Sequence, residues 1–253
     1  MAYFDKYGVE FSDDRKTLVK CPTELRGVYT IPEGVKEIED DAFFYCEHMT
    51  SISFSNDVEK IGSRAFQYCT SLESVFLSNN LKEIGWCAFM DCRMLKDIKI
   101  PENVSRIDEY AFGNCTNLKS IFIPQSVYHI ESLSFDNCTN LESINVDSNN
   151  RCYCSIDGVL LWKFGAALYL LRCPIKKYGS YIVPEKVRRI ELFAFQNCVN
   201  LTSITLPMGL SNVLDSAFWG CNNLQKIIVP YGQRSRFAKM EGLAKYAGII
   251  MER

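Results

Sequence analysis

Cysteine is the residue type with the most chemical potential in this sequence, which has 253 residues and 12 cysteines. Seven of the cysteines each follow a phenylalanine by three positions, as in "AFGNC" at 111–115. They recur with a constant 23-residue spacing, apart from one longer step between the fifth and the sixth. These regularly spaced residues are Cys46, Cys69, Cys92, Cys115, Cys138, Cys198 and Cys221.

The constant spacing limits what these seven thiols can do. If each repeat forms one layer of a stack, each layer contributes one sulfur, and all the sulfurs point the same way. A zinc site needs about four converging ligands, and a disulfide needs side chains that face each other. Cysteine also packs well as a small buried hydrophobe. We therefore interpret the seven as core residues, with disulfides and a metal site as the alternatives.

Four of the other five cysteines need a separate interpretation. Cys152 and Cys154 form a C-x-C pair outside the regular series, which matches neither a redox C-x-x-C motif nor half of a zinc site. We expect both to be exposed, and the sequence leaves their redox state open. Cys21 and Cys173 occupy equivalent positions in two similar segments, "LVKCP" at 18–22 and "LLRCP" at 170–174, which favours packing.

Patterns typical of enzymes do not occur in the sequence. The two histidines, His48 and His129, fall at different places in their repeats, and no nucleotide-binding, zinc-protease or serine-hydrolase motif is found. We interpret the carboxylates of Glu37, Glu39, Asp40 and Asp41 as a solvated face. The sequence therefore predicts no catalytic residue, no metal site, no cofactor and no enzyme activity.

The 23-residue repeat predicts a solenoid, because one unit cannot bury its own apolar face. Segments such as "LKSIFI" at 118–123 alternate apolar and polar residues, which is the period of a β-strand. Equivalent strands in stacked coils must run parallel, roughly 4.8 Å apart. The recurring "V-x-x-I" predicts a short extended or turn segment. "A-F-x-x-C" is too short for a helix and predicts an irregular or 3₁₀-like turn.

The two similar segments continue into a second shared phrase, "YTIPEGVKEI" at 29–38 and "YIVPEKVRRI" at 181–190. The chain thus has two blocks, and each begins with a hairpin. The stretch "GVLLWKFGAALYLL" at 158–171 is too apolar for a solvated linker, so we expect it to bury against neighbouring coils. Near the end of the chain, helical spacing predicts a short amphipathic cap containing Phe237, Met240, Leu243, Ala244 and Ala247.

Together these segments predict one solenoid domain over residues 1–253, mostly β, with a parallel sheet. The expected order is an N-terminal cap hairpin at 1–30, five coils at 31–146, an inserted hairpin at 147–183, two coils at 184–229 and a C-terminal cap at 230–253.

Composition and charge limit the partners. The net charge of −2 gives no strong field to attract nucleic acid or anionic lipid. No apolar run reaches the roughly 18 residues of a membrane span, so we expect no membrane insertion. The first residues lack the basic start and apolar stretch of a signal peptide. We expect a cytoplasmic location for the chain as written, or a cell-surface or secreted one if a signal has been removed.

The phrase "IPENVSRIDEYAFGNCTNLKSIFIP" at 100–124 resembles the BspA-like leucine-rich repeat family. The hairpin segment beginning "YCSIDGVLL" at 153–161 is also similar to that family, and the resemblance covers about residues 8–232. It implies an α/β, mostly β, right-handed leucine-rich-repeat solenoid with a parallel sheet on its concave face. It also implies a binding role, since such repeats are mainly protein-interaction scaffolds and known members are bacterial surface adhesins. No catalytic residue is implied.

The concave face carries the candidate binding residues. In "S-I-x-I" the apolar residues point into the core, and the residues before and between them point outward. Two aromatics stand at outward positions, which suggests either a binding patch or tolerated exposed apolar surface. We predict that an unidentified protein or peptide binds a monomeric chain there. The alternative is a bacterial surface adhesin for host matrix protein or carbohydrate. The candidate residues are Phe76, Lys99, Phe122, Asp97 and Asn145.

Overall fold

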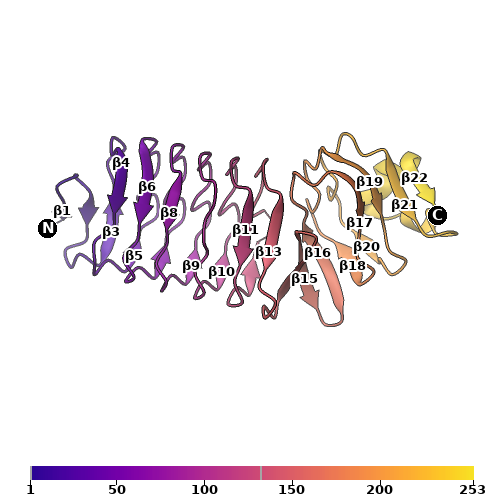
Figure 1. The fold of residues 1–253 in the computed structure, drawn as a ribbon, viewed down its shortest axis with the longest axis horizontal. Helices are drawn as coiled ribbons and strands as arrows, with labels where there is room; N and C mark the ends of the chain where they lie inside the picture. Colours follow the sequence, from indigo (N-terminus) through magenta and orange to yellow (C-terminus); the bar gives the residue numbers. More distant parts are fainter. Residues whose placement is uncertain (1, 132) are drawn as a thin grey trace. The chain divides into compact units, whose positions relative to one another are not determined.

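The computed structural model describes residues 2–131 and 133–253, and Figure 1 shows its fold. The chain divides into two compact units. The first comprises residues 1–141 and 147–150, and the second comprises residues 142–146 and 151–253. The single domain that we expect from the sequence stays a prediction.

The first unit is built from two ladders of short strands (Figure 1). One ladder has the order β1-β2-β3-β5-β7-β9-β10-β12, antiparallel from β1 to β3 and parallel beyond, and the other is the parallel sheet β4-β6-β8. The strands are β1 (Tyr3–Phe4), β2 (Glu10–Phe11), β3 (Thr17–Lys20), β4 (Gly27–Thr30), β5 (Glu37–Ile38), β6 (Met49–Ser53), β7 (Lys60–Ile61), β8 (Ser74–Phe76), β9 (Glu83–Ile84), β10 (Arg106–Ile107), β11 (Ser120–Ile123) and β12 (His129–Ile130).

The predicted coil strands of this unit correspond to β6, β8 and β11, whereas residues 97–100, where a strand was also expected, form an isolated bridge between Lys99 and Phe122 instead. The "V-x-x-I" piece, for which extended or turn structure was expected, forms the second ladder through two-residue strands such as β7 and β9. In both of these two-residue strands the second residue is a buried isoleucine, and the side chain of the first residue points away from the core. Every coil therefore has two faces that can carry outward side chains.

The turns "A-F-x-x-C" join the two ladders and are irregular, as predicted. In one turn, Arg64 and Tyr68 have φ angles of 55° and 62° on either side of Phe66. This left-handed backbone directs amide groups toward the next coil: Phe66 N–H donates to Ala88 O at 2.7 Å, and Tyr68 N–H to Met90 O at 2.9 Å. Cys69 N–H donates back to Phe66 O at 3.2 Å, which closes a 3₁₀-like turn.

The phenylalanines of these turns form the centre of the first unit's core. Neighbouring rings stack nearly parallel, with centroids 4.8, 5.1, 5.7 and 5.8 Å apart along the series. All five side chains are buried. Because each coil contributes one ring, no coil has a complete core of its own. The stacked residues are Phe43, Phe66, Phe89, Phe112 and Phe135.

The second unit repeats this plan after a three-stranded antiparallel start (Figure 1). Its ladders have the orders β14-β15-β16-β18-β20 and β17-β19-β21-β22. The strands are β13 (Ser143–Val146), β14 (Tyr153–Ile156), β15 (Val159–Phe164), β16 (Ala167–Arg172), β17 (Gly179–Ile182), β18 (Val187–Ile190), β19 (Leu201–Thr205), β20 (Asn212–Val213), β21 (Lys226–Val229) and β22 (Ile250–Glu252).

The expected inserted hairpin is the β15–β16 pair, but its burial differs from the prediction. Leu161 and Leu170 are buried, as expected of an apolar segment. Phe164 is 54% exposed, and Trp162 and Tyr169 are partly exposed. The prediction that this apolar stretch buries against neighbouring coils is thus wrong for the outer half of the hairpin. Strand alternation sends every second side chain to the outside of the sheet.

The C-terminal cap also differs from one amphipathic helix. The segment forms α1 (Arg234–Phe237), a 3₁₀ helix η1 (Glu241–Ile249) and the strand β22, which extends the sheet beside β21. Phe237, Met240 and Leu243 are buried as expected, whereas Ala244 is exposed. The reason is the three-residue period of the 3₁₀ turn, which aligns residues at i and i+3 and turns the i+4 alanine away.

Candidate functional site

The regularly spaced cysteines are core residues that also donate hydrogen bonds. No disulfide joins any of the cysteines in the described part of the chain. Cys92 Sγ lies 3.2 Å from Phe66 O, and Cys115 Sγ lies 3.2 Å from Phe89 O, in each case the turn carbonyl of the preceding coil. Burial raises the pKa of both thiols well above the usual value. These cysteines are therefore packing residues, as interpreted, and their thiols also act as weak S–H donors, which the sequence did not predict.

The first thiol of each block has the same environment. Cys21 Sγ and Cys46 Sγ lie 3.4 and 3.6 Å from Pro22 O. In the second block, Cys173 Sγ and Cys198 Sγ both lie 3.7 Å from Pro174 O. These positions are equivalent, which agrees with the packing role expected for Cys21 and Cys173. By contrast, the C-x-C residues Cys152 and Cys154 are partly exposed rather than fully exposed.

The outward side chains of β4, β6, β8, residues 97–99 and β11 form what we call the strand face. The parallel register aligns Ser53 with Phe76, and Lys99 forms a bridge with Phe122. Phe76 is 62% exposed and Phe122 is 46% exposed, although both flank buried strand residues. Asp97 and Lys99 are exposed as well. Four of the five predicted residues thus point outward from the first unit.

The fifth predicted residue, Asn145, lies in the second unit, on β13. Its side chain is exposed, and its Nδ2 donates to Ser143 Oγ at 3.1 Å. Its grouping with the other four stays a prediction.

A hollow at the first end of the strand face adds residues that sequence reasoning missed. It encloses about 480 Å³ and is lined in part by Val28 and Thr30, the outward residues of β4. Tyr7 overlies this end: its ring lies 5.8 Å from that of Tyr29 in an edge-on arrangement. Tyr29 O–H donates to Asp5 Oδ2 at 2.8 Å, which fixes the hollow's inner wall. The pairing of a turn tyrosine with a buried one has no local signal in the sequence.

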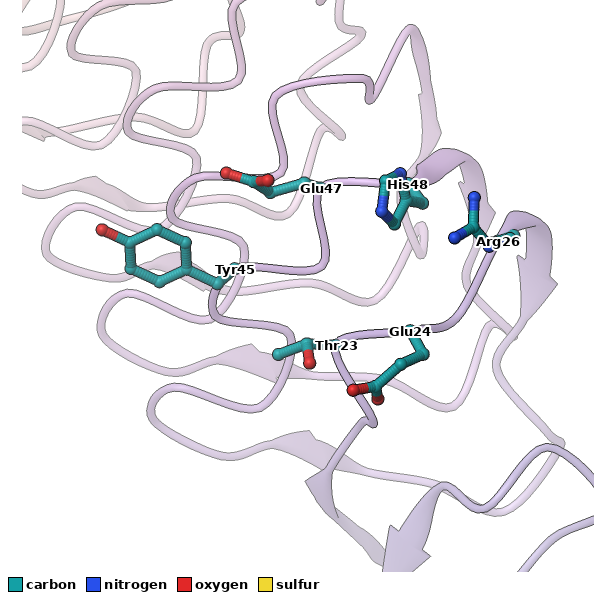
Figure 2. A pocket seen from close by; sticks show the side chains of 6 residues that line it. All are labelled: Thr23, Glu24, Arg26, Tyr45, Glu47 and His48. Carbon is teal, nitrogen blue, oxygen red and sulfur yellow. The ribbon is translucent and has the colours of Figure 1, made fainter.

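A second hollow, of about 460 Å³, opens beside the turns of the first coil. Figure 2 shows its six lining residues, which come from the segment before β4 and from the turn before β6. All six are exposed, including His48, so no lining group is shielded from water. The lining residues are Thr23, Glu24, Arg26, Tyr45, Glu47 and His48.

The two-residue strands carry a row of charged side chains that we call the charged row. Register places its members directly beside one another, and Lys60 pairs with Glu37 while Arg106 pairs with Asp108. His129 lies 2.9 Å from Glu131. The carboxylates at 37–41, interpreted as a solvated face, include one member of this row. The row consists of Glu37, Lys60, Glu83, Arg106 and His129.

Metal binding and membrane crossing each require a recognisable arrangement of side chains. In residues 2–131 and 133–253, no cluster of three or more histidine, cysteine, aspartate or glutamate side chains could hold a metal ion. Within the same described stretches, no helix has the length and apolar character needed to span a membrane.

Comparison with known families agrees with the repeat geometry. The family described as "BspA type Leucine rich repeat region" matches residues 30–153 and 173–240 with six copies. The chain therefore belongs to this family, and the predicted fold class is confirmed. No curated protein matches the sequence.

Solved bacterial structures show the same fold. A leucine-rich repeat protein from Eubacterium ventriosum is 25% identical with a TM-score of 0.69, and the match covers 88% of this chain and 63% of that one. This chain thus spans less than two thirds of that protein. A leucine-rich repeat protein from T. pallidum is 23% identical (TM-score 0.56; 86% and 87% covered). One from Bacteroides ovatus is 22% identical (TM-score 0.55; 91% and 70% covered).

Proposed function

We propose that the chain is a non-enzymatic interaction module that binds a protein or peptide on the strand face. The observation that carries this proposal is the exposure of Phe76 on β8 and Phe122 on β11, which lie two repeats apart in the sequence, with exposed Lys99 between them bridged to Phe122. Leucine-rich repeats stack into extended surfaces that serve for binding. Aromatic residues are enriched among the residues that dominate interface energies.

The surroundings of the two rings suit a peptide. Lys99, paired with Phe122, and Asp97 in the neighbouring outward column place both signs of charge beside the apolar rings. The serines of β6, β8 and β11 can hydrogen-bond a peptide backbone without blocking its approach. The hollow beneath Tyr7 would take one side chain at the end of the same face.

The test is the double variant Phe76→Ala plus Phe122→Ala. Both side chains lie outside the core, so we expect a nearly unchanged melting temperature. We expect binding of a natural partner to weaken at least tenfold, because truncating a central aromatic can cost about 2 kcal/mol or more. Partners would first be identified by affinity capture from source-organism lysate and from host extracellular material, then measured with purified components.

Tyr128→Ala is the matched control. Tyr128 is 61% exposed in the first unit and precedes β12 of the other ladder, so its loss should leave binding intact. Normal binding by the double variant would show that the partner uses another surface. Unfolding of the double variant would contradict the outward register.

A further inference from the structure

The hairpin β15–β16 carries an aromatic cluster that the repeat itself does not explain. The Trp162 ring lies 5.4 Å from that of Tyr169 and 5.5 Å from that of Phe164, and the Phe164 and Tyr169 rings stack at 5.1 Å. All three rings are at least partly exposed, Phe164 by 54%. Three large rings that contact one another on a sheet surface form a continuous apolar patch rather than scattered exposure.

The patch continues across the sheet as a row. Register pairs Trp162 with Tyr169, Tyr169 with Arg189, and Arg189 with Asn212. The Arg189 guanidinium lies 5.7 Å from the centre of the Tyr169 ring and its Nε is 2.9 Å from Glu191 Oε1. We call Trp162, Phe164, Tyr169, Arg189 and Asn212 the aromatic row. Arg189 and Asn212 occupy the positions in the second unit that the charged row occupies in the first, and the three rings lie on the hairpin that precedes them.

The hairpin β2–β3 of the first unit can be compared with the hairpin β15–β16, because the two have the same strand pairing. Thr17 pairs with Glu37 as Tyr169 pairs with Arg189, and Leu18 pairs with Ile38 as Leu170 pairs with Ile190. Opposite Thr17, in the place of Trp162, stands Ser12, whose Oγ accepts from Thr17 N–H at 3.0 Å. The fold therefore accepts a serine and a threonine where the second hairpin has a tryptophan and a tyrosine.

The charges around the aromatic row indicate the character of its partner. Residues 185–191, which include β18, contain three cationic residues, Lys186, Arg188 and Arg189, and two carboxylates, Glu185 and Glu191. Glu191 is already paired with Arg189. The local excess is positive although the chain as a whole has a net charge of −2. Complementary charge steers binding and selects among partners.

We propose that the aromatic row is a second interaction surface that binds an acidic peptide segment with a large apolar side chain. The apolar side chain packs on the Trp162, Phe164 and Tyr169 rings, and the flanking carboxylates lie against the cationic residues at 186–189. Tryptophan, tyrosine and arginine are the residue types most enriched among interface hot spots. This surface is separate from the strand face, and its binding does not depend on that proposal.

The test uses a random peptide library selected on the full chain. We expect the enriched peptides to combine acidic residues with a large apolar residue and to bind more weakly as salt rises. The triple variant Trp162→Ser, Phe164→Ser, Tyr169→Thr should reduce their affinity at least tenfold. Tyr178→Ser, which removes an isolated tyrosine that is 81% exposed in the same unit, should leave it unchanged. The Phe76→Ala plus Phe122→Ala variant should also bind them normally.

Three results would overturn the proposal. They are an enriched pool that is neutral or basic, a selection that enriches nothing, and affinity that survives the triple variant. Co-sedimentation of the full chain, but not of the triple variant, with phosphatidylserine vesicles would assign the patch to a lipid surface instead. If the triple variant loses its far-ultraviolet circular dichroism signal, Phe164→Ser alone provides the same comparison, because that ring is more than half exposed.

Discussion

The two hairpins of this protein share one backbone plan and carry different surfaces. In both, the inward residues are apolar, and a basic residue near the end donates to a turn carbonyl of the first coil: Lys20 to Asp41 O at 2.6 Å, and Arg172 to Phe193 O at 3.1 Å. The outward residues differ, with Ser12 and Thr17 in one and Trp162 and Tyr169 in the other. Packing against neighbouring coils restricts the inward positions to apolar residues. The outward positions face solvent, so their residue types can differ between the two hairpins.

The same contrast extends along both ladders. Beyond the first hairpin, four of the five residues of the charged row are paired: Glu37 with Lys60, Arg106 with Asp108, and His129 with Glu131. On the second hairpin, aromatic rings remain partly exposed to solvent. From this comparison we expect binding to use the surfaces that depart from the repeat, and the interior to behave alike in both units.

The largest expected effect tests this likeness of the interiors. Phe89 stacks between Phe66 and Phe112, while Phe218 lies between Phe195, at 5.0 Å, and Tyr246, at 5.8 Å. Because both rings are fully buried, Phe89→Ala and Phe218→Ala should each lower the free energy of unfolding by about 3–5 kcal/mol. Urea denaturation would measure this. A cost below about 1 kcal/mol for either one would break the comparison.

An intermediate effect concerns the thiols. Cys92→Ala and Cys221→Ala should each cost about 1–2 kcal/mol, since each removes a buried sulfur and its hydrogen bond to a turn carbonyl. The carbonyl of Phe66 keeps the N–H of Cys69 as a donor, which limits the loss. Urea denaturation of the two variants beside the parent chain would measure the cost, and a stability equal to the parent's would contradict the core role of these sulfurs.

The same thiols allow a labelling experiment. A thiol reagent should modify Cys152 in the folded protein, and Cys154 more slowly because burial raises the pKa of that thiol. It should reach the seven regularly spaced cysteines only after unfolding, because those are buried and burial raises the pKa of Cys92 and Cys115. The melting temperature should be the same with and without reductant. A decrease of several degrees on reduction would instead reveal a disulfide.

The smallest effect distinguishes one carboxylate in each unit by how its contribution to stability depends on pH. The hydrogen bond and charge of Lys82 lower the pKa of Glu59 in the first unit, so its stabilisation is present above the usual pKa and is lost as pH falls through the folded pKa. Burial raises the pKa of Glu191 in the second unit, so its contribution falls as pH rises from 4.5 through the folded pKa.

These opposite signs predict opposite behaviour of two matched variants. Glu59→Gln should flatten the loss of stability between neutral pH and pH 4, and Glu191→Gln should steepen it. Urea denaturation at low salt over a pH series would measure both slopes. Equal slopes in the two variants would contradict the assigned environments.

Much of the fold could be predicted from the sequence, because every repeat has the same apolar positions and must bury them against its neighbours. The 23-residue period predicted the stacked coils, the buried phenylalanines and cysteines, and the outward positions of Phe76 and Phe122. It did not predict the second ladder, because a two-residue strand such as Lys60–Ile61 is too short for a periodic signal. The hollow beneath Tyr7 could not be predicted either, since it depends on a contact between the Tyr7 and Tyr29 rings, which are distant in the sequence.

The sequence by itself determined the class of structure, because only stacking can bury an apolar face that each repeat presents again. Tertiary structure alone decided which outward side chains meet. Tyr169 and Arg189 belong to different strands and become neighbours only through the register of β16 and β18. Tertiary structure also decided that the aromatic rings of "GVLLWKFGAALYLL" stay partly exposed. The composition of a strand shows how apolar it is, but strand pairing determines which of its two faces is exposed to water.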